Sequence, residues 1–81
     1  MNDTEARTLL GSLLHRSAPE VDLSEVDPLA PLQEEIDLDS MDFLNLVTAL
    51  HDTAGIDVPE RDYPLVSTIA GFVDYVTAHT V

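Results

Sequence analysis

The stretch Asp37-Leu38-Asp39-Ser40-Met41-Asp42-Phe43-Leu44 lies where a loop rich in proline and acidic residues ends and a helix begins. Asp39 is a favourable N-cap residue, and Asp42 follows it three positions later, close to the arrangement of a capping box. Carboxylates in a first helical turn also suit the positive end of the helix dipole. We therefore predict a helix over about residues 40–53, with Gly55 as its C-terminal cap. Capping alone would account for both aspartates, so this pattern does not by itself indicate a function.

The two sides of this predicted helix differ in character. Apolar residues recur at helical spacing along the side that should face the core: Phe43, Leu46, Val47, Leu50 and Ala54. The opposite side carries Met41, Asn45, Thr48 and Asp52, with Leu44 at its edge. Two large apolar residues thus lie beside Ser40 on a side that should face water, which is typical of a docking surface.

At this point the sequence resembles the acyl carrier protein family, which includes peptidyl and aminoacyl carrier proteins. The family has Asp-Ser-Leu at the start of its second helix, and the same place here reads Asp39-Ser40-Met41. Similar residues continue from about residue 4 to residue 78, among them Asp42, Leu46, Val47, Ala49, Leu50, Ile56-Asp57-Val58-Pro59, Ser67-Thr68-Ile69 and Val73-Asp74-Tyr75-Val76. The resemblance implies an all-α four-helix bundle with a long first loop and a short third helix.

The resemblance also implies a function, that of a group carrier rather than an enzyme. A phosphopantetheinyl transferase would attach 4′-phosphopantetheine from coenzyme A to Ser40, with Mg²⁺ assisting and Asp39 helping to position the metal and the transferase. The thiol of this arm would hold an acyl or aminoacyl group as a thioester. The family's partner-docking positions correspond to Met41, Asp42, Leu44, Asn45, Thr48, His51 and Asp52. The expected partners of this monomer are the transferase, an acyl- or aminoacyl-loading ligase, and a downstream synthase or transferase.

The sequence departs from the fatty-acid members of the family in several places. Their second helix usually carries many glutamates, whereas here no charged residue lies between Asp42 and Asp52. Asp37 stands where the family often has glycine, residues 38–41 are more similar to some aminoacyl carriers such as those for D-alanine, and Pro64 interrupts the usual third helix. These departures favour a specialised carrier, with fatty acyl, polyketide and amino acid cargo all left open.

Length and composition fit one small acidic domain spanning residues 1–81. Sixteen acidic residues face three basic ones, for a net charge of −13, and 44% of the residues are hydrophobic. Such a chain should avoid nucleic acid and anionic membranes and attract basic protein surfaces. It has no cysteine, so any thiol chemistry must come from an added group. Without signal-peptide features or an apolar run of membrane-spanning length, we expect a cytoplasmic protein.

The first half of the chain predicts one helix and a long connection. Asp3 or Thr4 can cap the helix, which should end at residues 17–19. Its predicted buried stripe is Ala6, Leu9, Leu10, Leu13 and Leu14. The connection over residues 18–38 should be held against the core by its apolar residues, with a short helical turn around residues 29–35. These apolar residues are Val21, Leu23, Val26, Leu29, Leu32, Ile36 and Leu38.

The second half of the chain predicts a brief third element and a last helix. Pro59 suits the first position of a short helical turn, which Pro64 should end. The last helix should begin near Ser67 or Thr68, and Gly71 should weaken it slightly. Its predicted buried stripe is Ile69, Phe72, Val73 and Val76.

Other chemistries fit the sequence less well. The aspartates from Asp37 onward fail the calcium-loop pattern, because loop position 5 would be Met41. His15, His51 and His79 lack zinc-site spacing. A hydrolase would need a base near Ser40, and His51 lies about 16 Å further along the same helix. We predict no metal site and no catalytic residue. The alternative function is an unmodified acidic interaction module, which would not need the Ser40 hydroxyl.

Overall fold

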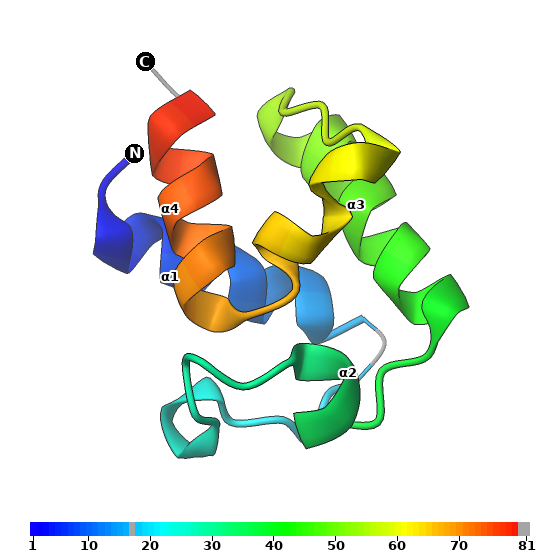
Figure 1. The fold of residues 1–81 in the computed structure, drawn as a ribbon. Coiled ribbons are helices and arrows are strands. Elements are labelled where there is room, and N and C mark those ends of the chain that lie inside the picture. The colour runs from blue at the N-terminus through cyan, green and yellow to red at the C-terminus, as the bar shows by residue number, and fades with distance from the viewer. Residues whose placement is uncertain (17, 80–81) are drawn as a thin grey trace.

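The computed structural model describes residues 1–16 and 18–79, and this part of the chain forms four α-helices and two 3₁₀-helices (Figure 1). In chain order they are α1 (Asp3–Leu14), η1 (Leu23–Glu25), α2 (Leu32–Glu35), α3 (Ser40–Ala54), η2 (Glu60–Val66) and α4 (Ile69–His79). The predicted all-α bundle with a long first loop is confirmed. η2 is its short third helix, and η1 and α2 are short turns within the first loop.

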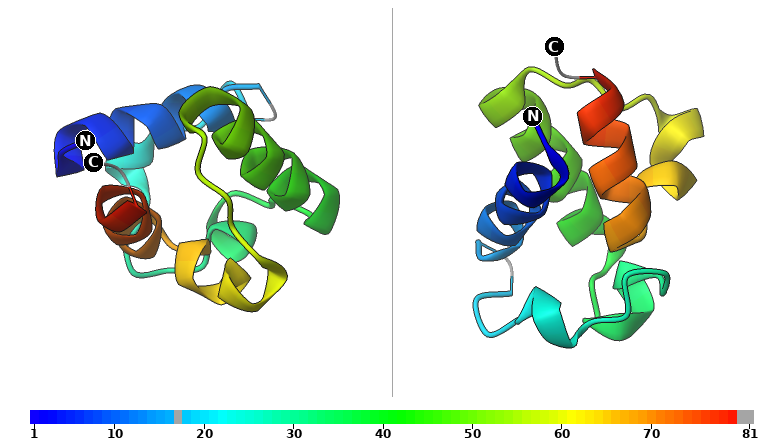
Figure 2. Two further views of the ribbon diagram at one scale, coloured as in Figure 1. Left: turned by 90° about the horizontal axis from the view of Figure 1, so that it is seen from above. Right: turned by 90° about the vertical axis from the view of Figure 1, so that its left-hand side faces the viewer.

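Four of these elements surround a common centre. Seen from above in Figure 2, α1, α3, η2 and α4 follow one another around the bundle. α1 makes its most extensive contact with α4 and also contacts α3, while η2 packs on α4. The first loop, with η1 and α2, runs across one end of the bundle and leads directly into α3 (Figure 1). The start of α3 therefore lies at the end of the bundle that this loop covers.

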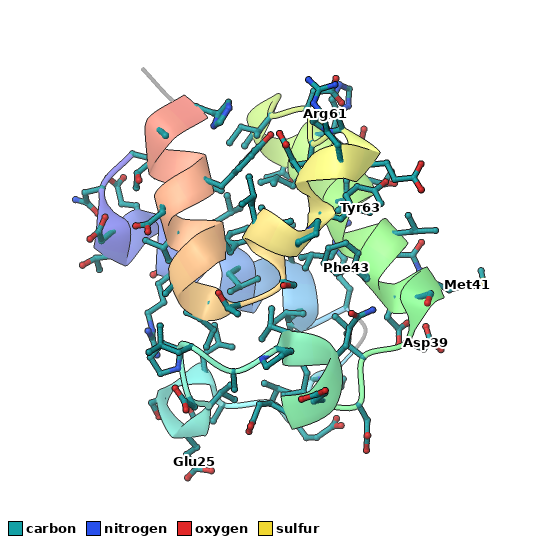
Figure 3. All side chains as sticks on the ribbon, viewed as in Figure 1. Glu25, Asp39, Met41, Phe43, Arg61 and Tyr63 are labelled. Carbon is teal, nitrogen blue, oxygen red and sulfur yellow. The ribbon has the colours of Figure 1, made fainter. Side chains whose placement is uncertain are left out.

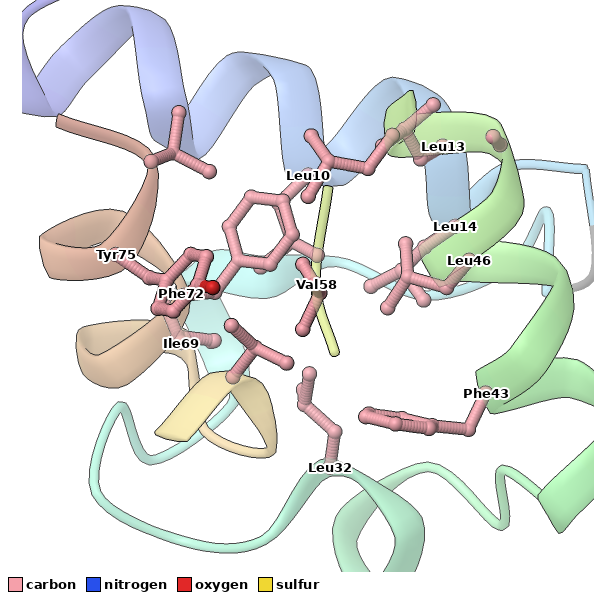
Figure 4. Close-up of a cluster of buried hydrophobic side chains, with 14 of the residues drawn as sticks. Leu10, Leu13, Leu14, Leu32, Phe43, Leu46, Val58, Ile69, Phe72 and Tyr75 are labelled. Carbon is pink, nitrogen blue, oxygen red and sulfur yellow. The ribbon is translucent and has the colours of Figure 1, made fainter. Parts of the chain in front are cut away.

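The centre of the bundle is filled by apolar side chains from all of these elements except η1 (Figure 4). They are Ala6, Leu10, Leu13, Leu14, Leu32, Leu38, Phe43, Leu46, Ala49, Leu50, Ile56, Val58, Val66, Ile69, Phe72, Tyr75 and Val76. Most of the predicted stripes are confirmed, but Leu9, Val47, Ala54 and Val73 are only half-buried. Ala49 of α3 and Tyr75 of α4 are buried instead. Each of these helices packs against neighbours on two sides, so its buried surface does not coincide with the single stripe that periodicity predicts.

The ends of α1 differ from the prediction at both termini. Asn2, not Asp3 or Thr4, is the N-cap, because its side chain accepts the Glu5 N–H at 2.8 Å and Glu5 accepts the Asn2 N–H at 3.2 Å. This reciprocal pair is a capping box. The helix ends at Leu14, before the predicted end at residues 17–19. Ala18 is buried, and its N–H still donates to the Leu14 carbonyl at 2.7 Å. Ser17 lies outside the described residues.

The long connection is held to the rest of the fold, as predicted. Two backbone hydrogen bonds join it to the start of α4: the Leu32 N–H donates to the Ser67 carbonyl at 2.8 Å, and the Ala70 N–H donates to the Pro28 carbonyl at 3.0 Å. Leu32 is also fully buried. The segment that leads into α3 is thereby fixed against the start of α4.

The prediction that every apolar residue of this connection faces the core is wrong for Leu29. Its side chain is 77% exposed. The Asp27 carboxylate accepts the Leu29 N–H at 2.9 Å, and the Asp27 carbonyl accepts the Ala30 N–H at 3.1 Å. These bonds form a tight turn, and Leu29 lies on its outer side.

η2 is a 3₁₀-helix that continues through Pro64 to Val66. The prediction that Pro64 ends it is wrong, because the fixed φ of proline is compatible with a 3₁₀ conformation and only its own N–H is missing. Tyr75 of α4 holds the element in place: its hydroxyl donates to an Asp62 carboxylate oxygen at 2.9 Å and lies 3.5 Å from the Asp57 carbonyl. Helical periodicity did not predict that Tyr75 is buried. A tyrosine hydroxyl needs a hydrogen-bond partner when it is buried, and the partner here, Asp62, comes from another element.

The buried Tyr75 hydroxyl should make the protein less stable at alkaline pH. Burial raises the pKa of Tyr75, and the hydrogen bond to the Asp62 carboxylate raises it further. Because the folded state favours the neutral phenol, this contribution to stability is complete below the unfolded pKa of about 10. It is lost as the pH rises through the folded pKa.

Urea unfolding at about pH 8 and about pH 11 tests this contribution. The three basic side chains are all arginines, and the chain has no lysine, so tyrosines dominate titration in this range. Tyr75→Phe should reduce the alkaline loss of stability, whereas Tyr63→Phe, which keeps Tyr75, should retain it. Equal alkaline losses in both variants would contradict the assignment.

Candidate functional site

The backbone before α3 is shaped by three consecutive residues. Asp37 has a φ of 53°, in the left-handed region that aspartate tolerates better than most residues. Leu38 is only 4% exposed and anchors the turn in the core. Asp39 then caps the helix, and its carboxylate accepts the Asp42 N–H at 2.8 Å, as predicted. Asp37 thus supports a turn at the position where the resembling family often has glycine.

Ser40 is the first residue of α3, and its side chain is exposed. Its hydroxyl makes no hydrogen bond with any residue in the described part of the chain. The backbone N–H groups of Ser40 and Met41 likewise have no acceptor among the described residues. Two free N–H groups at the positive end of a 15-residue helix favour an anion at this place.

Asp39 should be important for the stability of α3. Asp39→Ala removes the acceptor of the Asp42 N–H and should lower the free energy of unfolding by about 1 kcal/mol, which corresponds to roughly 4–8 °C in Tm. Asp39→Asn keeps a capping oxygen and should lose less. Thermal melts followed by circular dichroism measure both variants, and equal losses would show that the capping bond is not the cause.

The outer face of α3 is the surface that the sequence indicated. Met41 is 72% exposed and Leu44 is 47% exposed. Figure 3 shows the Met41 side chain extending away from the bundle, close to Asp39. Of the seven predicted docking positions, Asp42 is half-buried and six are exposed: Met41, Leu44, Asn45, Thr48, His51 and Asp52. The structure therefore places all of them on or at the edge of one continuous helix face.

A hollow of about 500 Å³ opens beside Ser40, between α3 and η2. Its lining residues are Gln33, Ser40, Phe43, Leu44, Glu60, Tyr63, Pro64 and Ser67. The Tyr63 ring meets the Phe43 ring edge-on, with centroids 5.3 Å apart and an interplanar angle of 73° (Figure 3). Sequence reasoning missed the five residues outside α3, because they come from two separate segments, α2 and residues 60–67, and no local pattern shows that these meet α3.

Carboxylates dominate the surroundings of Ser40. Asp39 and Asp42 flank it on the helix, and Glu60 belongs to the opposite wall of the hollow. Within residues 1–16 and 18–79 the one ion pair joins His51 and Asp52, 3.7 Å apart, and both side chains are largely exposed. Such a pair contributes little. No three acidic or histidine side chains of the described part could together hold a metal ion.

Ser40 lacks the partners that a serine nucleophile needs. No histidine is among the residues that line the hollow, and the hydroxyl has no hydrogen-bonded base. His51, the nearest histidine on α3, is eleven residues away and exposed. A serine hydroxyl is a weak nucleophile without a base, so the described residues do not form a serine-hydrolase site around Ser40.

Comparison with known proteins identifies the family. A family model described as a phosphopantetheine attachment site matches residues 6–76. The acyl carrier protein of Rubrobacter xylanophilus is 36% identical over 59 residues, which are 73% of this chain and 73% of that protein. The chain belongs to the acyl carrier protein family. The acyl carrier protein of Lactobacillus johnsonii is 32% identical over 73% of this chain and 74% of its own length. A mitochondrial acyl carrier protein of Arabidopsis thaliana is 34% identical over 73% of this chain and 47% of its own length.

Family membership settles the general role. The protein is a carrier rather than an enzyme, and 4′-phosphopantetheine is its prosthetic group. Proteins of this family work with phosphopantetheinyl transferases and synthases. The alternative of an unmodified acidic interaction module is not favoured. No helix in the described residues has the length and apolar character needed to cross a membrane.

The start of α3 fits this prosthetic group. A phosphodiester on the Ser40 oxygen would meet the two free N–H groups of Ser40 and Met41. The adjoining hollow offers apolar side chains together with the polar groups of Gln33, Glu60 and Ser67. When bound, the group supplies a thiol, which the cysteine-free chain lacks.

Proposed function

We propose that Ser40 carries the 4′-phosphopantetheine arm of this acyl carrier protein. The observation that supports this most directly is the exposed Ser40 hydroxyl without a hydrogen-bond partner at the N-terminus of α3. An incoming transferase can reach this oxygen without breaking any internal contact. Asp39 caps the helix through one carboxylate oxygen, and its other oxygen remains available to help position Mg²⁺ and the transferase.

The attachment reaction balances with coenzyme A as the donor. The Ser40 oxygen forms a bond to the phosphorus that bears pantetheine, and the bond from this phosphorus to the bridging pyrophosphate oxygen breaks. Adenosine 3′,5′-bisphosphate leaves, and the hydroxyl proton passes to a base of the transferase, since Ser40 has no base of its own. Asp39 and the helix N-terminus act only by positioning.

The outer face of α3 serves as the docking surface for partner enzymes. Met41 and Leu44 provide exposed apolar contacts next to Ser40, and the polar Asn45 and Thr48 continue the face. Carboxylates lie only at its two ends, with Asp39 and Asp42 at one end and Asp52 at the other. A partner protein that binds this face needs an apolar patch at the centre of its own binding surface. A glutamate-rich helix would instead select a partner whose binding surface is basic throughout.

This charge pattern supports a specialised carrier that is loaded by a dedicated acyl- or aminoacyl ligase and used by a downstream synthase or transferase. Because the whole chain carries a net charge of −13, basic groups at the rim of a partner would still speed its approach. Nucleic acid is not among the expected partners, since its phosphates would be repelled.

Intact mass spectrometry tests the attachment site. The purified protein is incubated with coenzyme A, Mg²⁺ and a promiscuous phosphopantetheinyl transferase, and the product is digested and mapped. We expect a gain of one phosphopantetheine, located on the peptide that contains Ser40. A folded protein that gains no mass, or that gains it on another peptide, would contradict the proposal.

A further inference from the structure

The hollow beside Ser40 combines a largely apolar wall with one negative charge. Phe43, Leu44, Tyr63 and Pro64 form the apolar part of its lining. Among the described residues that line it, Glu60 is the only charged one, and none is an arginine. A guest with an apolar body and a positive end would match this lining, whereas a guest with a carboxylate would find no cation there.

The three arginines of the chain are all occupied or placed elsewhere. Arg7 donates to the Leu23 carbonyl at 3.0 Å. Arg16 lines a separate cleft between α1 and α3, together with Asn45 and Asp52. Arg61 extends at the opposite end of α3 from Asp39 and Met41 (Figure 3). The negative charge of Glu60 is therefore not neutralised within the hollow.

The wall that carries Glu60 is held in place from two sides. The Tyr75 hydroxyl binds the Asp62 carboxylate at 2.9 Å and so fastens η2 to α4. On the other side, Tyr63 of η2 meets Phe43 of α3 edge-on. Glu60 is the first residue of η2, so its backbone is fixed relative to Ser40 even though its side chain is exposed.

From this geometry we infer that Glu60 makes the hollow selective among the cargoes of the arm, for aminoacyl groups, whose ammonium is positive, over dicarboxylic acyl groups. This inference rests on the proposed attachment at Ser40. The apolar lining shelters the carbon chain of the cargo, and the Glu60 carboxylate attracts its charged end. With a net charge of −13, the rest of the surface also opposes a carboxylate cargo.

Thioester exchange measures whether the cargo is sheltered. The transferase is supplied with β-alanyl-, butyryl- or malonyl-coenzyme A, so that the arm arrives with a cationic, a neutral or an anionic cargo. β-Alanyl and butyryl groups have the same length and differ mainly in charge. Each loaded protein is then treated with the neutral thiol N-acetylcysteamine, and the loss of cargo is followed by intact mass.

Two pairs of variants separate the charge from the apolar lining. Glu60→Gln removes the charge in the hollow, and Glu25→Gln removes an exposed charge on η1, far from Tyr63 and Met41 (Figure 3). Leu44→Ala removes an apolar lining residue, and Leu65→Ala removes a leucine that is 56% exposed and lies outside the hollow. The exchange rate of each cargo is compared between the two variants of a pair, so differences in intrinsic reactivity between the cargoes do not affect the result.

We expect Glu60→Gln to speed the exchange of β-alanyl cargo about threefold relative to Glu25→Gln, the size of one water-screened charge pair at close range. Butyryl exchange should not differ within this pair, and malonyl exchange should slow or stay equal. Leu44→Ala should speed both β-alanyl and butyryl exchange relative to Leu65→Ala. Equal β-alanyl exchange rates in Glu60→Gln and Glu25→Gln would overturn the inference. The attachment at Ser40 would be unaffected, since loading is seen separately as the initial gain of mass.

Discussion

Replacing Ser40 by alanine is expected to abolish the gain of phosphopantetheine mass while leaving the fold intact. The hydroxyl is exposed and bonds to no residue of the described chain, so its loss leaves no buried partner unsatisfied. The cap of α3 comes from the Asp39 side chain and does not involve the Ser40 side chain. We therefore expect the free energy of unfolding to change by no more than about 0.5 kcal/mol.

Ser67→Ala is the matched control for this experiment. Ser67 also lines the hollow, but its hydroxyl donates to the Pro64 carbonyl at 2.8 Å. This variant should still gain one phosphopantetheine, although it loses one hydrogen bond and about 1 kcal/mol of stability. Intact mass and a thermal melt are recorded for both variants. If Ser40→Ala still gains the mass, another hydroxyl carries the arm; if Ser67→Ala also fails, the transferase needs the hollow rather than Ser40 alone.

The start of α3 could be predicted from the sequence because its determinants are local. The Asp39 cap, the αL conformation of Gly55 with a φ of 69°, and the exposure of Met41 each depend on residues within one or two helical turns. The family signature coincides with the same few residues. Local capping rules therefore found the helix, and the resemblance gave it a candidate role.

The walls of the hollow could not be predicted in this way. Tyr63 faces Phe43 only because η2 is fastened to α4, and the bond that fastens it joins Tyr75 to Asp62, thirteen residues earlier in the chain. Each of these contacts depends on which segments meet in space. Periodicity describes one helix at a time, so it placed Tyr75 outside the buried stripe and gave no signal for the role of Asp62.

Gly71 shows the same limit most clearly, and its replacement should have the largest effect on stability. From the sequence alone this glycine only weakens α4. In the structure, a Cβ atom on Gly71 would overlap the Leu65 carbonyl oxygen and would lie 3.0 Å from the Thr68 Oγ1. Thr68 accepts the Gly71 N–H at 3.0 Å and so caps α4. The missing side chain is what allows the end of η2 to pack against the first turn of α4.

Gly71→Ala should therefore destabilise the protein by about 3 kcal/mol, because the atom that would have to move is a backbone carbonyl rather than a flexible side chain. For a domain of this size the loss corresponds to a fall in Tm of roughly 12–24 °C. Because the overlap is with Leu65 of η2, the amide protons of η2 should exchange faster with solvent than those of α3 in the Gly71→Ala variant.

Gly11→Ala is the control that makes this prediction specific. Gly11 lies within α1, and an added Cβ would meet the Leu23 Cδ1 at 3.7 Å, an ordinary van der Waals contact. This change should raise the free energy of unfolding by up to about 1 kcal/mol, because alanine favours a helix interior more than glycine does. The two substitutions are chemically identical, so opposite signs in urea unfolding would assign the loss to the contact with Leu65. Losses of similar size in both variants would mean instead that the close approach at Gly71 relaxes at little cost.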